Sequence, residues 1–357
     1  MPYINIDSFT CAELTAAVNK IPAMPGLLGQ FFEEKGMTTT TAAIDVKKGQ
    51  LHLVHDTPRG ADDGDVPAQD SRSTVHLPAA HLPQHDTLLP DDLQDRRAFG
   101  SDQPETGADR ILDKQITMRR NIEVTKEFHR VGAVKGKVLD ADGTTVLYDI
   151  YKTFGLSAGI DENITWPLDS TGAQNTVLTV FQDVCGTIDD AMGGWAYNGI
   201  AAICGKTFWD YLISNPFVRD AYNLWAANLS RFGDNDFRNR AFNYGGITWY
   251  RYGKKVGGKL LVEDTKAHVF PYGPGIFQTF NAPANYNETA NTLGLPFYSK
   301  IEERKFGKGF DLEVQANPLT LCMFPEALVT LTGAEAESAS LNTFSEPVAE
   351  DNKNEDA

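Results

Sequence analysis

Residues 108–150 read ADRILDKQITMRRNIEVTKEFHRVGAVKGKVLDADGTTVLYDI, and this stretch decides the fold. No Gly or Pro interrupts its first two dozen positions, and apolar side chains such as Ile111 and Met118 follow the spacing of one helical face. The pattern predicts a helix over residues 108–130 that ends at Gly132. At about 1.5 Å per residue, such a helix is roughly 35 Å long, which is long for a globular domain.

A hairpin is predicted directly after this helix. Residues 134–139 and 145–150 have strand-like composition, and the turn-forming segment Asp140-Ala141-Asp142-Gly143 joins them. We therefore expect a long helix and its hairpin to form a spine on which the rest of the chain is arranged.

Composition narrows the class of protein. The 357 residues carry a formal charge of −16, which argues against a protein that coats nucleic acid, and their apolar content suffices for one large or two modest cores. The four cysteines form no CxxC pair, so we expect neither disulfides nor a zinc finger. No apolar run approaches the roughly 18 residues of a membrane span, and the start lacks the pattern of a signal peptide. We expect a soluble, intracellular protein.

Residues 1–40 are predicted to form an arm. Thr10 and Glu13 have the spacing of a capping box, which predicts a short helix over residues 11–20. After two prolines, a second short apolar segment contains Leu27 and Phe31. Two small amphipathic pieces cannot form a core alone, so they must pack on another surface, with a neighbouring subunit as one candidate.

Residues 41–104 are poor in core-forming side chains. Residues 42–46 and 50–55 resemble strands, and a Gly- and Asp-rich segment follows them. We predict a long two-stranded excursion with a mobile tip over about residues 41–95.

The composition of a true core begins near residue 171. Apolar residues from Val177 to Met192 predict an amphipathic helix closed by Gly193-Gly194, and further helices are expected from Lys206 and from Pro216. Strands are expected between and after these helices, which indicates an α+β fold. The acid-rich tail after Gly333 is predicted to be disordered. The expected strands cover residues 200–204, 247–252, 259–262, 268–272, 310–315 and 327–331.

Histidines in residues 52–86 suggest an alternative function. His52 with His55, and His81 with His85, resemble two ligand pairs, and His76, Asp56 and Asp86 lie in the same segment. They would serve a metal-dependent hydrolase only if each pair lay on a helix or tight turn. The surrounding prolines and strand patterning favour a solvated, His-rich loop instead.

Other candidate motifs have structural explanations. Residues 199–207 resemble a phosphate-binding loop, but one residue too many separates the glycines, and we predict a strand-to-helix turn with Thr207 in the first helical turn. The adjacent acids Asp189-Asp190 and Glu302-Glu303 are expected on the surface rather than in a glycosidase site. The aromatic run over residues 249–252 fits strand alternation better than a base-stacking platform. We expect no catalytic residue, cofactor or metal.

The order of arm, long excursion, spine helix with hairpin, compact α+β region and returning strands resembles the fold of tailed-phage major capsid proteins. Several local stretches narrow this resemblance, and they are AVKGKV at 133–138, CGKTFW at 204–209, NPFV at 215–218, YGGI at 244–247, VFPYG at 269–273, GLPFY at 294–298, EVQANPL at 313–319 and residues 322–328. Together they cover most of residues 105–332. In their order and spacing the chain resembles the phage major capsid protein E family, which includes the lambda-type head protein.

The resemblance implies a structural protein that assembles as hexamers and pentamers into an icosahedral head around double-stranded DNA, in the virion, after assembly in the host cytoplasm. It also implies a scaffold protein and a portal as partners, a decoration protein as an optional one, packaged DNA held without sequence specificity, and no membrane. The implied parts are an arm (1–40), an extended loop (41–95), a peripheral domain with the spine helix and hairpin (96–170), an axial domain (171–304), return strands of the peripheral domain (305–332) and an acidic tail (333–357).

Three questions stay open on sequence alone. Basic residues on the spine can either face the shell interior or pair with acidic neighbours; they are Lys114, Arg119, Arg120, Lys126 and Arg130. Lys47 and Lys48 are candidates for a crosslink between subunits, which we do not expect to form. A minor or decorating head protein is a further alternative, against which the long helix and large axial region argue.

Overall fold

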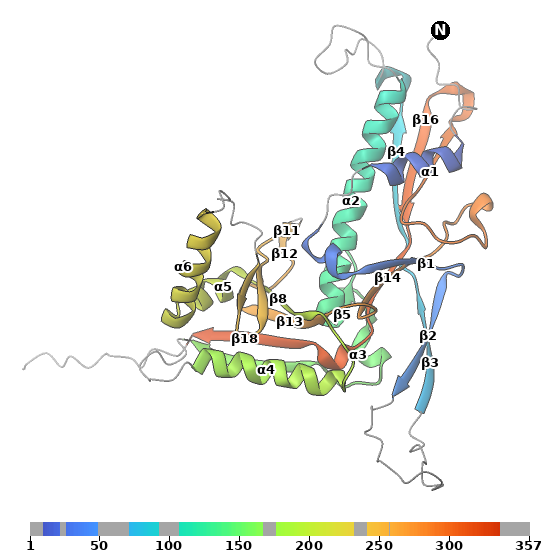
Figure 1. Ribbon diagram of the computed structural model, residues 1–357. Helices are drawn as coiled ribbons and strands as arrows, with labels where there is room; N and C mark the ends of the chain where they lie inside the picture. Colours follow the sequence, from blue (N-terminus) through green and yellow to red (C-terminus); the bar gives the residue numbers. More distant parts are fainter. Residues whose placement is uncertain are drawn as a thin grey trace, which may run out of the picture.

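A computed structural model describes residues 10–21, 26–48, 71–92, 107–166, 176–231, 241–256 and 258–335. Figure 1 shows a long helix beside a narrow sheet at one end of the molecule and a larger sheet with several helices at the other. Helices and sheets are mixed along the chain, which confirms the predicted α+β class.

The spine helix is longer than predicted. α2 spans Gly107–Lys135, so it continues through Gly132 and includes Val134, which we had expected in a strand. Gly132 lies inside the helix, where its lack of a side chain allows a close approach of the following segment. A Cβ atom on it would lie 2.8 Å from the Lys137 carbonyl oxygen. The helix ends instead at Gly136, whose φ of 80° favours glycine.

The predicted hairpin follows, with shorter strands. β5 (Lys137–Leu139) pairs antiparallel with β6 (Val146–Asp149) around the predicted turn. The short helix α3 (Ile150–Thr153) then begins at Asp149, whose carboxylate accepts a hydrogen bond from the Lys152 amide.

A three-stranded sheet lies along α2. β16 (Phe310–Ala316) is its central strand, between β15 (Tyr298–Glu303) and β4 (Leu82–Leu88). β4 falls inside the extended loop that we predicted over residues 41–95, so that loop is shorter than expected. The Leu88 side chain of β4 is buried against α2, and this burial explains why residues 82–88 join the sheet.

The structure describes the two-stranded excursion over residues 41–48 and 71–78, where it is confirmed. The strand expected over residues 50–55 lies outside the described residues. β2 (Thr41–Lys48) pairs antiparallel with β3 (Ser71–Pro78), and Figure 1 shows the pair extending away from the body. The predicted mobile tip lies outside the described residues. The one-turn helix η3 (Pro90–Asp92) follows β4.

The arm folds back on its own chain. α1 (Cys11–Lys20) has the predicted capping box at Thr10 and Glu13, and it packs on β15 and α2. The 3₁₀ helix η2 (Leu27–Phe31) also contacts α2. Its continuation β1 (Glu33–Gly36) joins β14 (Phe277–Asn281) and β17 (Pro318–Cys322) in a second three-stranded sheet. A neighbouring subunit is therefore not needed to cover the described part of the arm.

The largest sheet has six strands among the described residues. Its order is β7-β18-β13-β8-β10-β9, with β8 flanked by antiparallel β13 and parallel β10. The predicted helices are present, and the two expected from Lys206 and from Pro216 begin at those residues. The strands and helices of this region are β7 (Ile160–Trp166), β8 (Gly199–Cys204), β9 (Phe242–Tyr244), β10 (Ile247–Arg251), β13 (Lys266–Tyr272), β18 (Val329–Glu335), α4 (Thr176–Met192), α5 (Lys206–Ser214) and α6 (Pro216–Arg231).

Smaller elements connect these sheets. Residues 259–262 were predicted as one strand, but only Lys259–Leu260 (β12) is paired, with Lys255–Val256 (β11). Residue 327, expected in the last strand, belongs instead to a short helix. The 3₁₀ helices are η4 (Asn287–Thr289), η5 (Lys305–Gly307) and η6 (Pro325–Ala327).

Strand pairing crosses two predicted boundaries. β18 begins in the predicted return strands of the peripheral domain and continues to Glu335, three residues into the predicted tail, and it pairs with β13 and β7 in the six-stranded sheet. β7 in turn precedes residue 171, where the axial domain was predicted to begin. These strands belong there because their apolar positions, such as Ile164 and Leu331, are buried in the core of that sheet.

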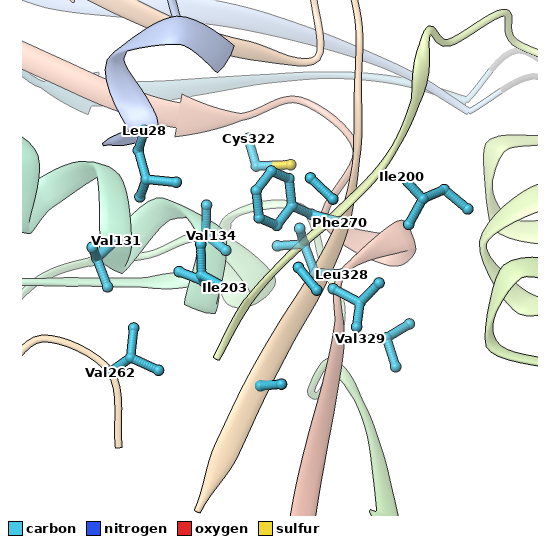
Figure 2. Packing of buried hydrophobic residues seen from close by; sticks show 14 of the residues in the cluster. Leu28, Val131, Val134, Ile200, Ile203, Val262, Phe270, Cys322, Leu328 and Val329 are labelled. Atoms are coloured by element: carbon cyan, nitrogen blue, oxygen red, sulfur yellow. The ribbon is translucent and has the colours of Figure 1, made fainter. Parts of the chain in front are cut away.

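Two apolar clusters hold the chain together. The larger one joins the six-stranded sheet, the β1-β14-β17 sheet and the C-terminal part of α2; Figure 2 shows Leu28, Val134, Ile203 and Phe270 among the residues that meet there. The smaller one lies between α1, the middle of α2 and the β15-β16-β4 sheet. The acidic tail, predicted as disordered, lies outside the described residues from 336 onward.

Candidate functional site

The histidines of residues 52–86 do not form a metal site in the described part of the chain. His76 lies on β3, and His81 Nδ1 is 2.8 Å from Asn317 Oδ1. His85 is 4.0 Å from Glu313. Since β4 is a strand, positions 81 and 85 are about 13 Å apart along it rather than one helical turn.

The acids of that segment serve structural contacts. Both Asp86 carboxylate oxygens accept hydrogen bonds of 2.9 Å from Lys114 Nζ on α2. Among the described residues, no group of three His, Cys, Asp or Glu side chains could hold a metal ion. His52, His55 and Asp56 lie outside the described residues. The hydrolase alternative has no support.

The segment that resembled a phosphate loop is the predicted strand-to-helix turn. The backbone of residues 200–204 is paired on both sides, with β13 and β10, so these amides are not free to bind phosphate. α5 begins at Lys206, directly after Gly205. A Cβ atom on Gly205 would lie 2.1 Å from the Glu263 carbonyl oxygen, so only glycine allows this close approach.

The remaining sequence candidates are also structural. Trp249 is fully buried and donates a hydrogen bond of 3.1 Å to the Tyr244 carbonyl oxygen, as strand alternation predicted. The Asp189 carboxylate accepts a hydrogen bond from the Tyr197 hydroxyl. Burial and this hydrogen bond raise the pKa of Tyr197 to about 12. Glu302 and Glu303 are exposed at the end of β15.

A cluster of charges, in which Lys126 and Glu127 are buried and Glu34 is partly exposed, fastens the arm to α2. Lys126 Nζ is 3.4 Å from Glu34 Oε1, and Arg130 Nη2 is 2.9 Å from the same oxygen. Burial alone would raise the pKa of Glu34, but the charges of Lys126 and Arg130 outweigh it and hold that pKa below its ordinary value. Burial lowers the pKa of Lys126, against the opposing effect of Glu34.

Glu127 is the centre of this cluster. Its Oε1 accepts hydrogen bonds from the Leu28 amide at 3.1 Å and from the Tyr252 hydroxyl at 2.9 Å. Its Oε2 lies 3.6 Å from Arg130. One carboxylate therefore connects the arm, the spine helix and the segment that follows β10. Sequence reasoning missed this role because the partners are about 100 positions away from Glu127 in both directions.

Arg119 caps the C-terminal end of α1. Its guanidinium donates to the carbonyl oxygens of Val18 and Ile21, pairs with Glu123 at 2.9 Å, and lies 4.7 Å from the centre of the Phe297 ring. A cation at these last carbonyls stabilises a helix C-terminus. Of the five basic spine residues named from sequence, all but the exposed Arg120 are paired with acids in the described chain, which confirms the pairing alternative for those four.

Three described features project outward and offer surfaces to a partner. The first is the β2–β3 extension. The second is the hairpin tip between β15 and β16, where Phe306 is 91% exposed and has a φ of 66°. The third is α6, where Leu224 is 69% exposed. The glycines of the segment KFGKG at 305–309 are typical of a turn, but local sequence does not show that its Phe side chain is exposed.

Comparison with known proteins places these features in context. The model of the family described as phage major capsid protein E matches residues 10–333. The major capsid protein of Salmonella phage Felix O1 is 27% identical over 90% of this chain and 95% of its own, and that of Pseudomonas phage KPP10 is 26% identical over 90% and 96%. A solved phage-related protein from Bordetella bronchiseptica RB50 overlaps 90% of this chain and 96% of its own, with a TM-score of 0.49 and 8% identity. The matched range includes the arm, α2 and all three larger sheets.

Proposed function

The chain belongs to the phage major capsid protein E family and is a structural component of a tailed-phage virion, and we propose that it assembles as hexamers and pentamers into the icosahedral head that encloses double-stranded DNA. The observation that carries the proposal is the unbroken family match over residues 10–333, which spans nearly every described element. The two relatives named as major capsid proteins are matched over nearly their whole length, which supports the same function.

The described architecture suits a repeating subunit. Among the residues that the structure describes, no layer covers the β2–β3 pair beyond its base, and an extended element of this kind gains its cover by lying on the next subunit. Rings close when one patch meets a different patch repeatedly by rotation. Several modest contacts per subunit then add by multivalency, so that wrong contacts dissociate while the shell grows.

We divide the subunit by its sheets. The peripheral domain comprises α2 with the β15-β16-β4 sheet and the arm, and the axial domain comprises the six-stranded sheet with α4, α5 and α6. In this division the axial helices surround the symmetry axes, and the β2–β3 pair is the extended loop that reaches the neighbour.

The proposed partners follow from this role. They are a scaffold protein during assembly in the host cytoplasm, the portal, a decoration protein on the finished shell, and packaged DNA that is contained rather than bound in sequence. The charge of −16 supports the last point, since an acidic wall does not hold phosphates strongly.

The test is the size of particles formed by the full chain, expressed alone and together with the scaffold of its phage. Sedimentation followed by negative-stain microscopy should show rings, tubes or closed shells. A monomer or dimer under both conditions would contradict the proposal. If that species instead bound preformed shells, the decorating-protein alternative would replace it.

A further inference from the structure

Exposed charges gather by sign at two corners of the six-stranded sheet. The first corner lies where β8 and β10 end and the chain continues into α5 and into the β11–β12 pair. Asp264, which is partly buried, is the acid that lies among the cations there. The exposed cations of this corner, called the basic corner from here on, are Lys206, Arg251, Lys254, Lys255 and Lys259.

The second corner lies where β7 and β18 begin. α4 packs on η6, and the Ile160 amide donates a hydrogen bond of 3.4 Å to the Leu328 carbonyl oxygen, so the starts of both strands meet the end of α4 here. Lys152 on α3, which also contacts η6, is an exposed cation on this side, and the acids outnumber it. The exposed acids of this corner, called the acidic corner from here on, are Asp161 and Glu162 on β7, Asp189 and Asp190 in the last turn of α4, and Glu326 in η6.

The two corners are diagonally opposite each other. β7 is parallel to β18, β18 and β8 are both antiparallel to β13, and β10 is parallel to β8, so β7 and β10 run in the same direction. The acids lie at the start of β7 and the cations at the end of β10. Four strand spacings, about 19 Å, separate the two strands across the sheet. Figure 1 likewise shows α4 below the sheet and the β11–β12 pair above it.

A second copy of this chain fits both corners at once. In a ring, one patch of each subunit meets a different patch of the next subunit by rotation. Two patches of opposite charge on opposite corners of one sheet are complementary in such a contact. The net charge of −16 makes whole copies repel one another, so attraction between them needs a local basic surface. Nucleic acid would fit the basic corner alone and would leave the acidic corner without a partner.

We propose that the basic corner of one subunit contacts the acidic corner of the next subunit around each ring of the shell. This inference rests on the proposed assembly into hexamers and pentamers, and it names the contact that joins neighbours within them. The contact is directional, because each subunit offers one corner to the neighbour before it and the other to the neighbour after it.

The test reverses one corner at a time in the full chain. K254E/K255E makes both corners acidic, and E162K/D190K makes both basic; Asp189 is kept because it accepts the hydrogen bond of Tyr197. Each variant alone should raise the protein concentration needed for ring formation by about tenfold, because attraction between neighbours becomes repulsion. Sedimentation and negative-stain microscopy measure this threshold under the conditions that assemble the wild type. The control K254R/K255R keeps the charge and should assemble like the wild type.

Mixing the two variants gives a result that misfolded subunits cannot give. An equimolar mixture contains one subunit with two acidic corners and one with two basic corners, so each kind binds only the other. A six-membered ring can alternate the two kinds, whereas a five-membered ring cannot. The mixture should therefore form hexameric rings or tubes near the wild-type concentration, without closed shells.

A second control separates the corners from net charge. K20E/R120E makes the same change of net charge as K254E/K255E, at exposed positions of α1 and α2 that lie outside both corners. It should leave the threshold for ring formation unchanged. An equal rise with K20E/R120E would show that overall charge governs the effect and would overturn the assignment of the corners.

The outcomes also separate this inference from the proposed function. If the wild type forms rings and K254E/K255E forms them at the same concentration, this inference fails and the proposed function stands. If the wild type forms no rings, the proposed function fails and the inference falls with it. Binding of a short DNA duplex that K254E/K255E abolishes, with ring formation unchanged, would assign the basic corner to phosphates instead.

Discussion

The two apolar clusters of this subunit are built in different ways. The cluster of the six-stranded sheet is rich in aromatic rings: Trp249 lies 4.6 Å from Phe181 and 6.1 Å from Phe208 between ring centres. The cluster along α2 consists mainly of aliphatic side chains and is bordered by buried charges, including Arg119, which is 4% exposed, and Lys126, which is 3% exposed.

The two regions depend on different interactions for their stability. Burial of large rings stabilises the sheet region through removal of apolar area from water, which needs no particular partner geometry. The spine region depends on specific donors and acceptors that must meet across the arm, because a buried charge without its partner is costly. Substitutions can separate these two contributions.

The largest expected loss is in the aromatic core. Trp249→Ala should lower the free energy of unfolding by about 4 kcal/mol, since a fully buried ring leaves a cavity that the packed sheet cannot fill. Urea unfolding of the unassembled subunit, followed by circular dichroism, measures this. The control is Trp195→Ala, where the side chain is 57% exposed and a much smaller loss is expected. Equal losses at the two positions would show that the ring is not a core element.

The next largest loss of stability is expected on lowering the pH, because of His129 on α2. This side chain is fully buried, and neither ring nitrogen has a hydrogen-bond partner among the described residues. Burial lowers its pKa to about 4, with Asp140 acting in the opposite direction. The unfolded chain therefore takes up a proton below about pH 6.5 that the folded chain refuses until about pH 4, and stability falls across that window by roughly 3 kcal/mol.

The variant His129→Leu has no proton to bind there. Its unfolding free energy, measured at several pH values, should therefore lose the contribution of His129 between about pH 6.5 and pH 4. His268, whose pKa is also lowered by burial, keeps its own contribution in both proteins. Below this window, carboxylates such as Glu34, whose pKa lies below its ordinary value, should still make both proteins acid-labile. A wild-type chain whose stability does not change between neutral pH and pH 5 would contradict the assignment.

Local patterns in the sequence were sufficient for most elements of the sheet region. The spacing of Val177 and Phe181 predicted α4, and Pro216 marked the start of α6. The spine was harder, because its end depends on packing. Gly132 looks like a helix terminator, but its lack of a side chain serves close contact with Lys137 and Val138. The helix therefore runs to Lys135, five residues beyond the predicted end at residue 130.

Long-range partners explain what sequence could not supply. Lys126 has the charge of a solvated face, and its ion-pair partner in the buried position, the arm residue Glu34, lies 92 positions earlier. β4 resembled part of a loop because the strand with which it pairs, β16, lies more than 220 positions later in the sequence. The surface candidates were similarly hidden, since exposure of Phe306 depends on which strands flank its turn.

The charged cluster predicts a smaller but sharper loss. Glu127→Ala should lower the free energy of unfolding by about 2 kcal/mol, because the Leu28 amide and the Tyr252 hydroxyl lose their buried acceptor. Glu127→Gln keeps one carbonyl oxygen for these donors and should lose about half as much. Chemical unfolding gives both values. Equal losses for Ala and Gln would mean that the charge beside Arg130, rather than the shared acceptor, holds the arm.

The smallest effect on the stability of the unassembled subunit is expected at the exposed tip of the hairpin between β15 and β16. Phe306 is 91% exposed and contributes little packing in the free chain, so Phe306→Gly should change its stability by less than about 0.5 kcal/mol. The substitution also relieves the left-handed backbone at φ 66°, which glycine adopts at no steric cost.

Although Phe306→Gly should hardly change the stability of the subunit, it should impair assembly. A bare ring held in a disfavoured conformation is explained if it packs on another subunit, so Phe306→Gly should raise the protein concentration needed for particle formation by about tenfold, as expected for loss of one buried aromatic contact. Light scattering across a concentration series measures this threshold. Phe306→Tyr retains the ring and should assemble like the wild type. If Gly and wild type assemble at the same concentration, the tip makes no contact in the shell, and the β2–β3 pair and α6 would be left as the surfaces that join subunits.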